Sequence, residues 1–157
     1  MSFYASSAKD GKTLVNEHRD IVFCAIVHSV RYSPMRAFKT KWFARLARQE
    51  LIADASLWEA IERAERGLID ADLGGGLIKQ RVARHGKGRS GGYRVIVAYR
   101  AKNRAVFLFG FAKNEQDNID ANQLTTARKV AESWLTAGTE RITQAIEENE
   151  LQEIKRD

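Results

Sequence analysis

Residues 77–113, LIKQRVARHGKGRSGGYRVIVAYRAKNRAVFLFGFAK, decide the fold of this chain. Turn-forming residues divide the stretch into three β-type runs, which are Leu77–Ala83, Tyr93–Arg100 and Ala105–Ala112. The first two runs alternate in polarity, as half-covered strands do, whereas the third is apolar on both faces, as a covered strand is. Strands joined by such short connections run antiparallel. We therefore expect an antiparallel sheet of three to four strands, with Arg36–Lys39 as the further strand.

Positive charge is concentrated in the same stretch, which has no acidic residue between Leu77 and Arg104. The cations are Lys79, Arg81, Arg84, Lys87, Arg89, Arg94, Arg100, Lys102 and Arg104. Subtracting these nine from the net charge of +6 leaves −3 for the rest of the chain, so the excess is local. A block of like charge usually marks a solvated tail, but strand-forming apolar residues interleave with this one. We interpret it as a folded sheet with a cationic face for phosphate.

Strand periodicity gathers three of these cations on one face. Lys79 and Arg81 project from the non-core face of the first strand, and Arg94 projects from the corresponding face of its neighbour. Cations about 4 Å apart repel one another by about 1 kcal/mol per pair even in water. A bound anion would remove that cost. The other interpretation is a solvated face that carboxylates from a helix neutralise.

The glycine-rich loop 85–92, HGKGRSGG, matches no known phosphate-binding motif. It lacks the Gly-Lys-Ser/Thr ending of a P-loop, and it leads into a strand rather than into a dinucleotide-binding helix. Either it only connects two strands, or its glycines let Lys87 and Arg89 approach phosphates closely. No nucleophile elbow surrounds Ser90. His85 is better explained as a surface residue than as a general base.

Two helices are expected before these strands. The segment Lys41–Arg48 carries an apolar stripe at helical spacing, formed by Trp42, Phe43, Leu46 and Ala47. A second helix is expected to begin at Ser56, whose spacing to Glu59 fits a capping box, and to stop at Gly67. The short connection predicts an N-terminal helical hairpin.

Further helices are expected after the strands. Asp120 and Gln123 have the spacing of a capping box, and Gly138 ends the helix that they open. A short helix over 139–148 and an extended edge over 150–154 follow. Together these elements predict an α+β fold, in which an antiparallel sheet packs against the helical hairpin and against C-terminal helices.

Three segments are distinguished along the chain. Residues 1–34 are expected to be a non-native or weakly ordered extension, because no periodic pattern links them to the rest. The alternative is an accessory strand or a partner-binding arm. Residues 35–136 form the main domain, and 137–157 form a C-terminal helix with a short extended tail.

Composition excludes several classes of protein. The chain has one cysteine and three histidines without metal-ligand spacing, so we expect no disulfide framework, metal or cofactor. We expect no signal peptide, and no run approaches the roughly 20 apolar residues that span a bilayer. A cytoplasmic protein without a membrane partner is expected, and the pI near 9.6 favours a polyanionic partner.

Three blocks of the chain together resemble the RelE/HigB-like toxins of type II toxin–antitoxin systems, within the RelE/ParE superfamily. The blocks are KQR at 79–81, GKGRSGGYR at 86–94 and GFAKNEQDNIDANQ at 110–123. Two helices followed by strands also match, and the likeness covers roughly Met35 to Leu135.

The resemblance implies a microbial-RNase-like fold and a toxin that enters the ribosome and cleaves mRNA. It implies catalytic roles for residues of the matching blocks, namely Lys79, Arg81, Arg94, Lys113 and Glu115. The remaining cations of the stretch are then expected to bind RNA, and they are Arg84, Lys87, Arg89 and Arg100. The implied partners are the ribosome, mRNA and a cognate antitoxin of helix-turn-helix type.

The chain departs from the best-studied branch of these toxins at two positions. Asn114 stands where that branch has an arginine, and Asp120 stands near the position of a tyrosine. The general base and acid are therefore open. Lysine can act as a base where neighbouring positive charge favours its neutral form, which makes Lys79 the first candidate. A ParE-like toxin that inhibits gyrase and a non-catalytic module that binds RNA or an antitoxin are the alternatives.

Overall fold

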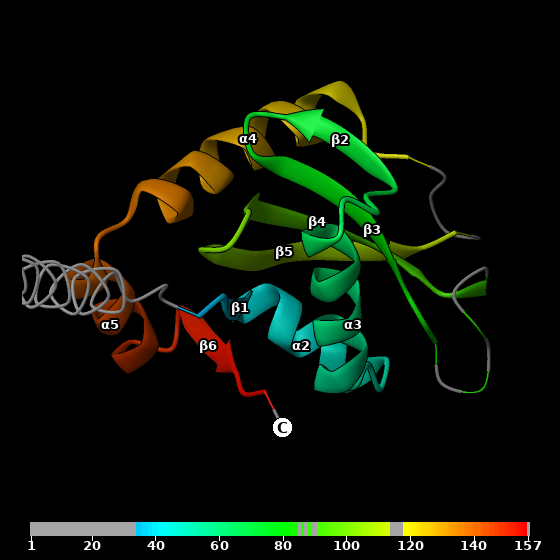
Figure 1. Cartoon of the computed structure of the whole chain (residues 1–157), viewed down its shortest axis with the longest axis horizontal. Helices are drawn as coiled ribbons and strands as arrows, with labels where there is room; N and C mark the ends of the chain where they lie inside the picture. Colours follow the sequence, from blue (N-terminus) through cyan, green and yellow to red (C-terminus); the bar gives the residue numbers. More distant parts are fainter. Residues whose placement is uncertain (1–33, 85, 87, 89–90, 114–117, 157) are drawn as a thin grey trace, which may run out of the picture. The chain divides into compact units, whose positions relative to one another are not determined.

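The computed structural model describes residues 34–156 except 85, 87, 89–90 and 114–117 (Figure 1). Residues 34–157 form one compact unit, and the extension expected at 1–34 lies almost entirely outside the described residues. The described elements, in chain order, are β1 (Arg36–Thr40), α2 (Lys41–Gln49), α3 (Asp54–Glu65), β2 (Ala71–Gly74), β3 (Leu77–Val82), β4 (Tyr93–Arg100), β5 (Arg104–Ala112), α4 (Ala121–Thr136), α5 (Thr139–Glu147) and β6 (Leu151–Ile154).

The strands form one mixed sheet in the order β2-β3-β4-β5-β1-β6. Only the β1–β5 pair among these strands is parallel, and the other four pairs are antiparallel. The expected α+β class is confirmed, but the described sheet has six strands rather than three to four. The edges explain the difference: β2 lies in a glycine-rich stretch that resembles a breaker, and β6 is only four residues long.

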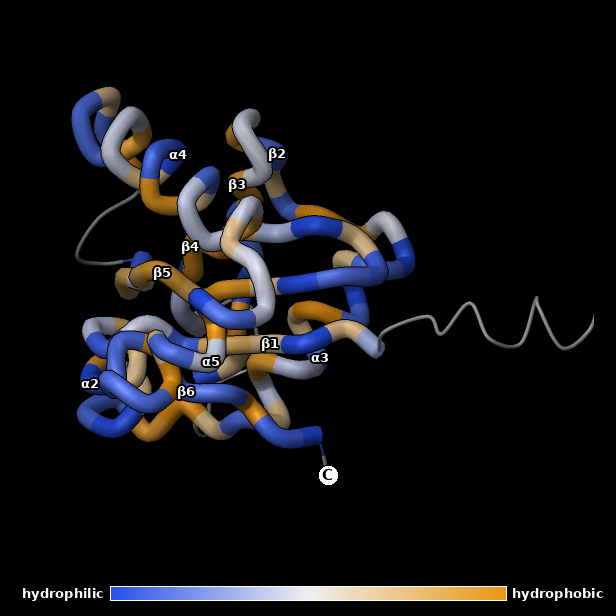
Figure 2. The backbone as a smooth tube through the Cα atoms, turned by 90° about the vertical axis from the view of Figure 1, so that its left-hand side faces the viewer, coloured by the Kyte–Doolittle hydropathy of each residue, from blue (hydrophilic) through white to orange (hydrophobic). Residues whose placement is uncertain are grey.

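Helices cover both faces of the sheet. On one face α2 and α3 enclose a cluster that includes Phe43, Leu57, Val95 and Phe107. On the other face α4 and α5 enclose a second cluster that includes Phe38, Ile96, Ala131 and Ile142. Figure 2 shows hydrophobic backbone segments in β4 and β5, between these helices. Both faces of the central strands are therefore buried, as the apolar pattern of 105–112 predicts.

The N-terminal helices differ from the prediction in detail. The hydroxyl of Thr40 caps α2 by accepting from the amide of Phe43 at 3.2 Å. The capping box predicted at Ser56 is wrong, because α3 begins at Asp54 after Ala53 and has no side-chain cap. The expected hairpin is only approximate, since α2 packs on β1, β5 and β6 whereas α3 packs on β3. The predicted stop is correct: Gly67 has a φ of +80°, which completes a Schellman-type turn.

The C-terminal helices follow the predicted signals. The carboxylate of Asp120 accepts from the amide of Gln123 at 2.8 Å, and the Gln123 side chain accepts from the amide of Asp120 at 3.1 Å. Gly138 separates α4 from α5. In the part of the chain that the structure describes, no helix combines the length and the apolar character that a membrane span requires.

Candidate nucleic-acid interface

Three of the predicted cations lie together on one face of the sheet. Arg81 of β3 is directly opposite Arg94 of β4 in the antiparallel register, and Lys79 is opposite Ile96. Because side chains alternate along a strand, all three share the face on which Ile96 packs against α4. We call Lys79, Arg81 and Arg94 the cationic cluster. The shared face predicted from strand periodicity is present in the structure.

Arg94 is the least neutralised member of the cationic cluster. Its side chain is partly buried, and its Nη1 atom is fully buried without a hydrogen-bond partner among the described residues. Its neighbour on β5 is Phe111, which offers no polar group. A buried donor without a partner costs about 1–3 kcal/mol. An anion that accepts from this guanidinium would recover that cost.

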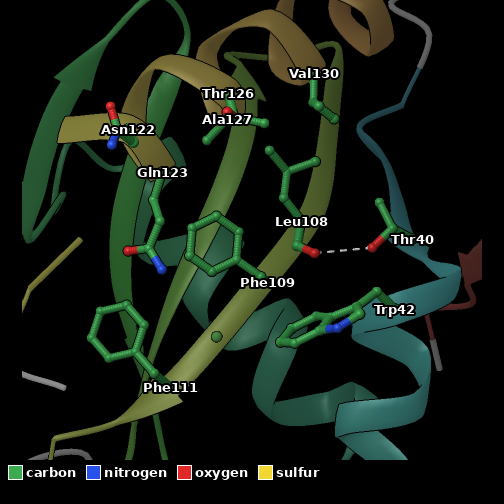
Figure 3. A pocket seen from close by; sticks show the side chains of 11 residues that line it. Thr40, Trp42, Leu108, Phe109, Phe111, Asn122, Gln123, Thr126, Ala127 and Val130 are labelled. Atoms are coloured by element: carbon green, nitrogen blue, oxygen red, sulfur yellow. Dashed lines mark hydrogen bonds between the residues drawn. The ribbon is translucent and has the colours of Figure 1, made fainter. Parts of the chain in front are cut away.

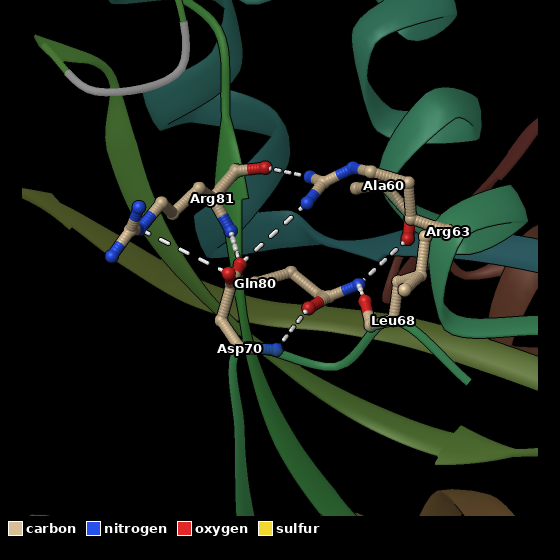
Figure 4. Close-up of polar contacts among 6 residues, drawn as sticks. All are labelled: Ala60, Arg63, Leu68, Asp70, Gln80 and Arg81. Carbon is tan, nitrogen blue, oxygen red and sulfur yellow. Dashed lines mark hydrogen bonds and ion pairs between the residues drawn. The ribbon is translucent and has the colours of Figure 1, made fainter. Parts of the chain in front are cut away.

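Arg81 has a carboxylate nearby, but the pairing is weak. Its Nε lies 3.9 Å from Oδ1 of Asp70, and half of its side chain is exposed. The same carboxylate lies 3.7 Å from the buried Arg63 and accepts from the Arg81 amide at 2.7 Å (Figure 4). Exposed pairs with such geometry contribute about 0–1 kcal/mol. Among the described residues, one carboxylate shared by two arginines leaves net positive charge at the cluster.

A polar network behind β3 holds the cationic cluster in place. The buried Gln80 donates to the carbonyls of Ala60 at 2.9 Å and Leu68 at 3.2 Å, and it accepts from the amide of Asp70 at 2.9 Å (Figure 4). Arg63 also donates to the carbonyl of Arg81. The end of α3 and the segment before β2 are thereby fixed against β3. Strand periodicity does not predict this network, because it assigns apolar residues to core-facing positions and Gln80 is polar.

Lys79 connects the sheet to the segment that leads into α4. Its Nζ donates to Oδ1 of Asn118 at 3.4 Å, two residues before the N-cap of α4. The free amides at a helix N-terminus carry partial positive charge. Lys113, the first residue after β5, is exposed. The cationic cluster therefore lies at the end of the sheet where α4 begins.

The other predicted site residues do not join this cluster. The guanidinium of Arg84 stacks over the ring of Tyr93, 5.7 Å from its centroid, and Tyr93 faces the α2–α3 side. Arg100 lies opposite Arg104 at the other end of β4. Lys87, Arg89 and Glu115, and also His85, lie outside the described residues.

Cations at the other end of the sheet have structural partners. Arg104 donates to the carbonyls of Trp134 and Ala137, at 2.7 and 2.8 Å, where α4 ends. Burial lowers the pKa of the Arg104 guanidinium, and the charges of Arg36 and Arg100 lower it further. Arg36 pairs with Glu153 of β6. Arg104, although part of the charged stretch, therefore has a structural role at the end of α4.

An apolar groove of about 700 Å³ opens beside the cationic cluster (Figure 3). It lies between β5, the start of α2 and the first turns of α4, and its lining includes Trp42, Phe109, Phe111, Asn122, Thr126 and Val130. Trp42 was expected in the apolar stripe of its helix, but its side chain is 55% exposed. Its neighbours Phe43 and Ala44 take the core-facing positions instead. Sequence periodicity gave no signal for the groove.

Metal ligation has no support among the described residues, where no group of three or more His, Cys, Asp or Glu side chains comes together. The described side chains at this site are cations, the carboxylate of Asp70, the amide of Asn118 and the aromatic rings of the groove.

Comparison with protein families identifies the scaffold. A family model described as the RelE toxin of the RelE/RelB toxin–antitoxin system matches residues 35–154. The match runs from the residue before β1 to the last residue of β6, so it extends beyond the likeness seen in sequence, which ended near Leu135.

Proposed function

The chain belongs to the RelE family of toxins, and we propose that its cationic cluster cleaves mRNA on the ribosome in the cytoplasm. Toxins of this family pair with antitoxins, so a cognate antitoxin is a partner of this chain. The observation that carries the nuclease proposal is the register of β3 and β4. It places two arginines opposite each other beside a lysine, and one buried guanidinium nitrogen has no partner among the described residues.

The proposed reaction needs only groups that such a site contains. The 2′-hydroxyl of a nucleotide attacks the adjacent phosphate, the bond from phosphorus to the 5′-oxygen breaks, and a 2′,3′-cyclic phosphate forms. A base accepts the proton of the 2′-hydroxyl, and an acid protonates the leaving 5′-oxygen. Negative charge grows on the phosphate oxygens in between, so that fixed cations bind the transition state more tightly than the substrate.

Roles follow from position and chemistry. Arg81 and Arg94 present planar guanidinium forks that can donate two hydrogen bonds each to phosphate oxygens. Lys79, held by Asn118, is the proposed base. Lys113 and Glu115, which come after β5 in sequence, are the proposed sources of the proton for the leaving oxygen.

The test is cleavage of a defined mRNA on translating ribosomes by the purified chain. We expect Lys79→Ala to slow cleavage about 10²–10⁴-fold, the usual effect of removing a general base. Arg94→Ala should slow it about 10²–10³-fold, the usual effect of removing one charge-stabilising donor. Arg66→Ala is the matched control, because it removes the same charge from an exposed position at the end of α3, on the other face of the sheet. Cleavage that survives the double variant Lys79→Ala/Arg94→Ala would overturn the proposed site.

Two other outcomes would replace the proposal rather than refine it. A DNA-damage response on induction of the chain, with intact mRNA, would indicate a toxin that inhibits gyrase. Salt-sensitive RNA binding without any product on translating ribosomes would indicate a non-catalytic RNA-binding module.

A further inference from the structure

The apolar groove is continuous with the cationic cluster through one strand position. Phe111, which lines the groove, is the register partner of Arg94 on β5. Opposite residues of an antiparallel pair lie about 5 Å apart. A phosphate bound by Arg94 is therefore adjacent to the mouth of the groove. A nucleotide next to that phosphate is within reach of the groove's walls.

The walls of the groove have the chemistry of a nucleobase site. Trp42 is 55% exposed, and its ring system is nearly perpendicular to that of Phe109, with the centroids 6.4 Å apart and the planes at 80°. This contact orients the indole while more than half of the residue stays exposed. The α4 wall contributes the exposed polar side chains of Asn122 and Thr126 (Figure 3). An aromatic surface with a few polar groups is how proteins bind unpaired bases.

Charge on α2 favours a nucleic acid over an apolar peptide in this groove. Arg45 is exposed and lies one turn after Trp42, so the two side chains are neighbours on the surface of the helix. The helix Lys41–Gln49 contains no acidic residue, and Arg45 has no ion-pair partner among the described side chains. A cation beside an exposed aromatic ring can bind the backbone of a single strand while the ring stacks on one of its bases.

We propose that this groove is a nucleobase-stacking subsite for single-stranded RNA, with Trp42 as its stacking surface. The inference rests on the proposed nuclease function. The inference adds that the base next to the phosphate bound by Arg94 stacks with its flat face on Trp42. Substrate RNA must then be unpaired and unstacked at this position, because a base inside a duplex offers no free face.

The experiment compares two oligonucleotides on the purified toxin without ribosomes. One is a single-stranded hexanucleotide that carries 2′-O-methyl groups to prevent cleavage. The other has the same charge and length but lacks all bases. We expect Trp42→Ala to weaken binding of the base-bearing strand about tenfold, as loss of one stacked base does, and to leave the abasic strand unchanged. Trp42→Phe should keep most of the base-dependent affinity.

Leu68→Ala is the matched control, because Leu68 is a similarly exposed apolar residue whose side chain lies outside the lining of the groove. Circular dichroism checks that every variant is folded. Equal losses for both strands, or no loss for either, would overturn the subsite. So would a Trp42→Ala variant that binds both strands normally but fails to bind its antitoxin, since the groove would then belong to the antitoxin.

The outcome is independent of the cleavage test. If base-dependent binding through Trp42 is found while the cluster variants still cleave mRNA, the subsite stands and the nuclease site falls. If cleavage depends on the cluster but the abasic strand binds as well as the base-bearing strand, the nuclease site stands and the subsite falls.

Discussion

Arg81 and Arg94 lie directly opposite each other across the β3–β4 ladder, on the sheet face that packs against α4. Like charges in such cross-strand pairs destabilise a sheet by up to about 1 kcal/mol. Among the described residues, the ion-pair partner of Arg81 is Asp70, which Arg81 shares with Arg63. The arrangement costs folding energy in the free protein, and a bound phosphate group would offset it.

The first prediction is that phosphate or sulfate stabilises the protein through Arg94. An anion that binds only the folded state at ten times its Kd adds about 1.4 kcal/mol, which is roughly 3–5 °C in Tm for a domain of this size. Arg94→Ala should lose most of this gain, whereas Arg100→Ala should keep it. The measurement is Tm in sulfate against chloride at equal ionic strength. Equal gains in both variants would contradict the prediction.

The second prediction concerns the buried amide behind the cluster. Gln80→Met preserves most of the volume of the side chain but leaves the amide of Asp70 and the carbonyls of Ala60 and Leu68 without their partner. We expect a loss of about 3 kcal/mol in the free energy of unfolding, measured in urea. Gln144→Met is the control, because this exposed glutamine bonds only to Glu148 among the described contacts and should cost less than about 0.5 kcal/mol. A cost for Gln80→Met no larger than the control's would refute the structural role of the network.

Strand periodicity explains why the central strands and the cationic cluster could be predicted. The bounds of β4 and the alternation of Tyr93 and Val95 against Arg94 follow from residue order alone. Because a period of two assigns a face, it also placed Lys79 and Arg81 beside Arg94. The capping box at Asp120 was equally local, since its two hydrogen bonds join residues three apart.

The parts that escaped prediction depend on distance and on tertiary contacts. Periodicity gives the face of a residue but not its tertiary partners, so it does not predict the hydrogen bonds from Gln80 to the carbonyls of Ala60 and Leu68. The exposure of Trp42 depends on which residues of α2 meet the sheet. The strand β2 forms because β3 offers it a partner, which overrides the weak strand propensity of its glycine-containing sequence.

The third prediction is a pH dependence at the sheet edge. Arg36 donates two hydrogen bonds to Glu153, at 2.8 and 3.0 Å, which join β1 to β6. These bonds hold the pKa of the Glu153 carboxyl below its ordinary value. A carboxyl with a lowered pKa in the folded state contributes stability that is complete above its ordinary pKa, near 4.3, and that is lost as the pH falls through the folded value.

Glu153→Gln should therefore lower the free energy of unfolding by about 0.5 kcal/mol at pH 7, the usual size for a partly exposed pair. The difference from the natural chain should disappear in acid, as measured by urea titrations between pH 7 and pH 3. Glu147→Gln, at an exposed position of α5, is the matched control, because it makes the same change of side chain away from Arg36. A difference for Glu153→Gln that stays constant with pH would show that the carboxylate charge is not the cause.

The fourth prediction gives a physical reason for the second glycine of the SGGYR block. A methyl group on Gly92 would overlap the carbonyl oxygen of Val82, where the ends of β3 and β4 meet. Gly92→Ala must therefore displace the backbone, and overpacking of this kind costs about 1–3 kcal/mol. Val82 follows Arg81, and Gly92 is two residues before Arg94, so the displacement also changes how the two guanidinium groups face each other. We expect mRNA cleavage to fall more steeply than stability.

Gly88→Ala is the control, because a methyl group there would lie in open space and its backbone does not require glycine. If Gly92→Ala kept both Tm and cleavage rate, close packing of these strand ends would not be what positions the cationic cluster.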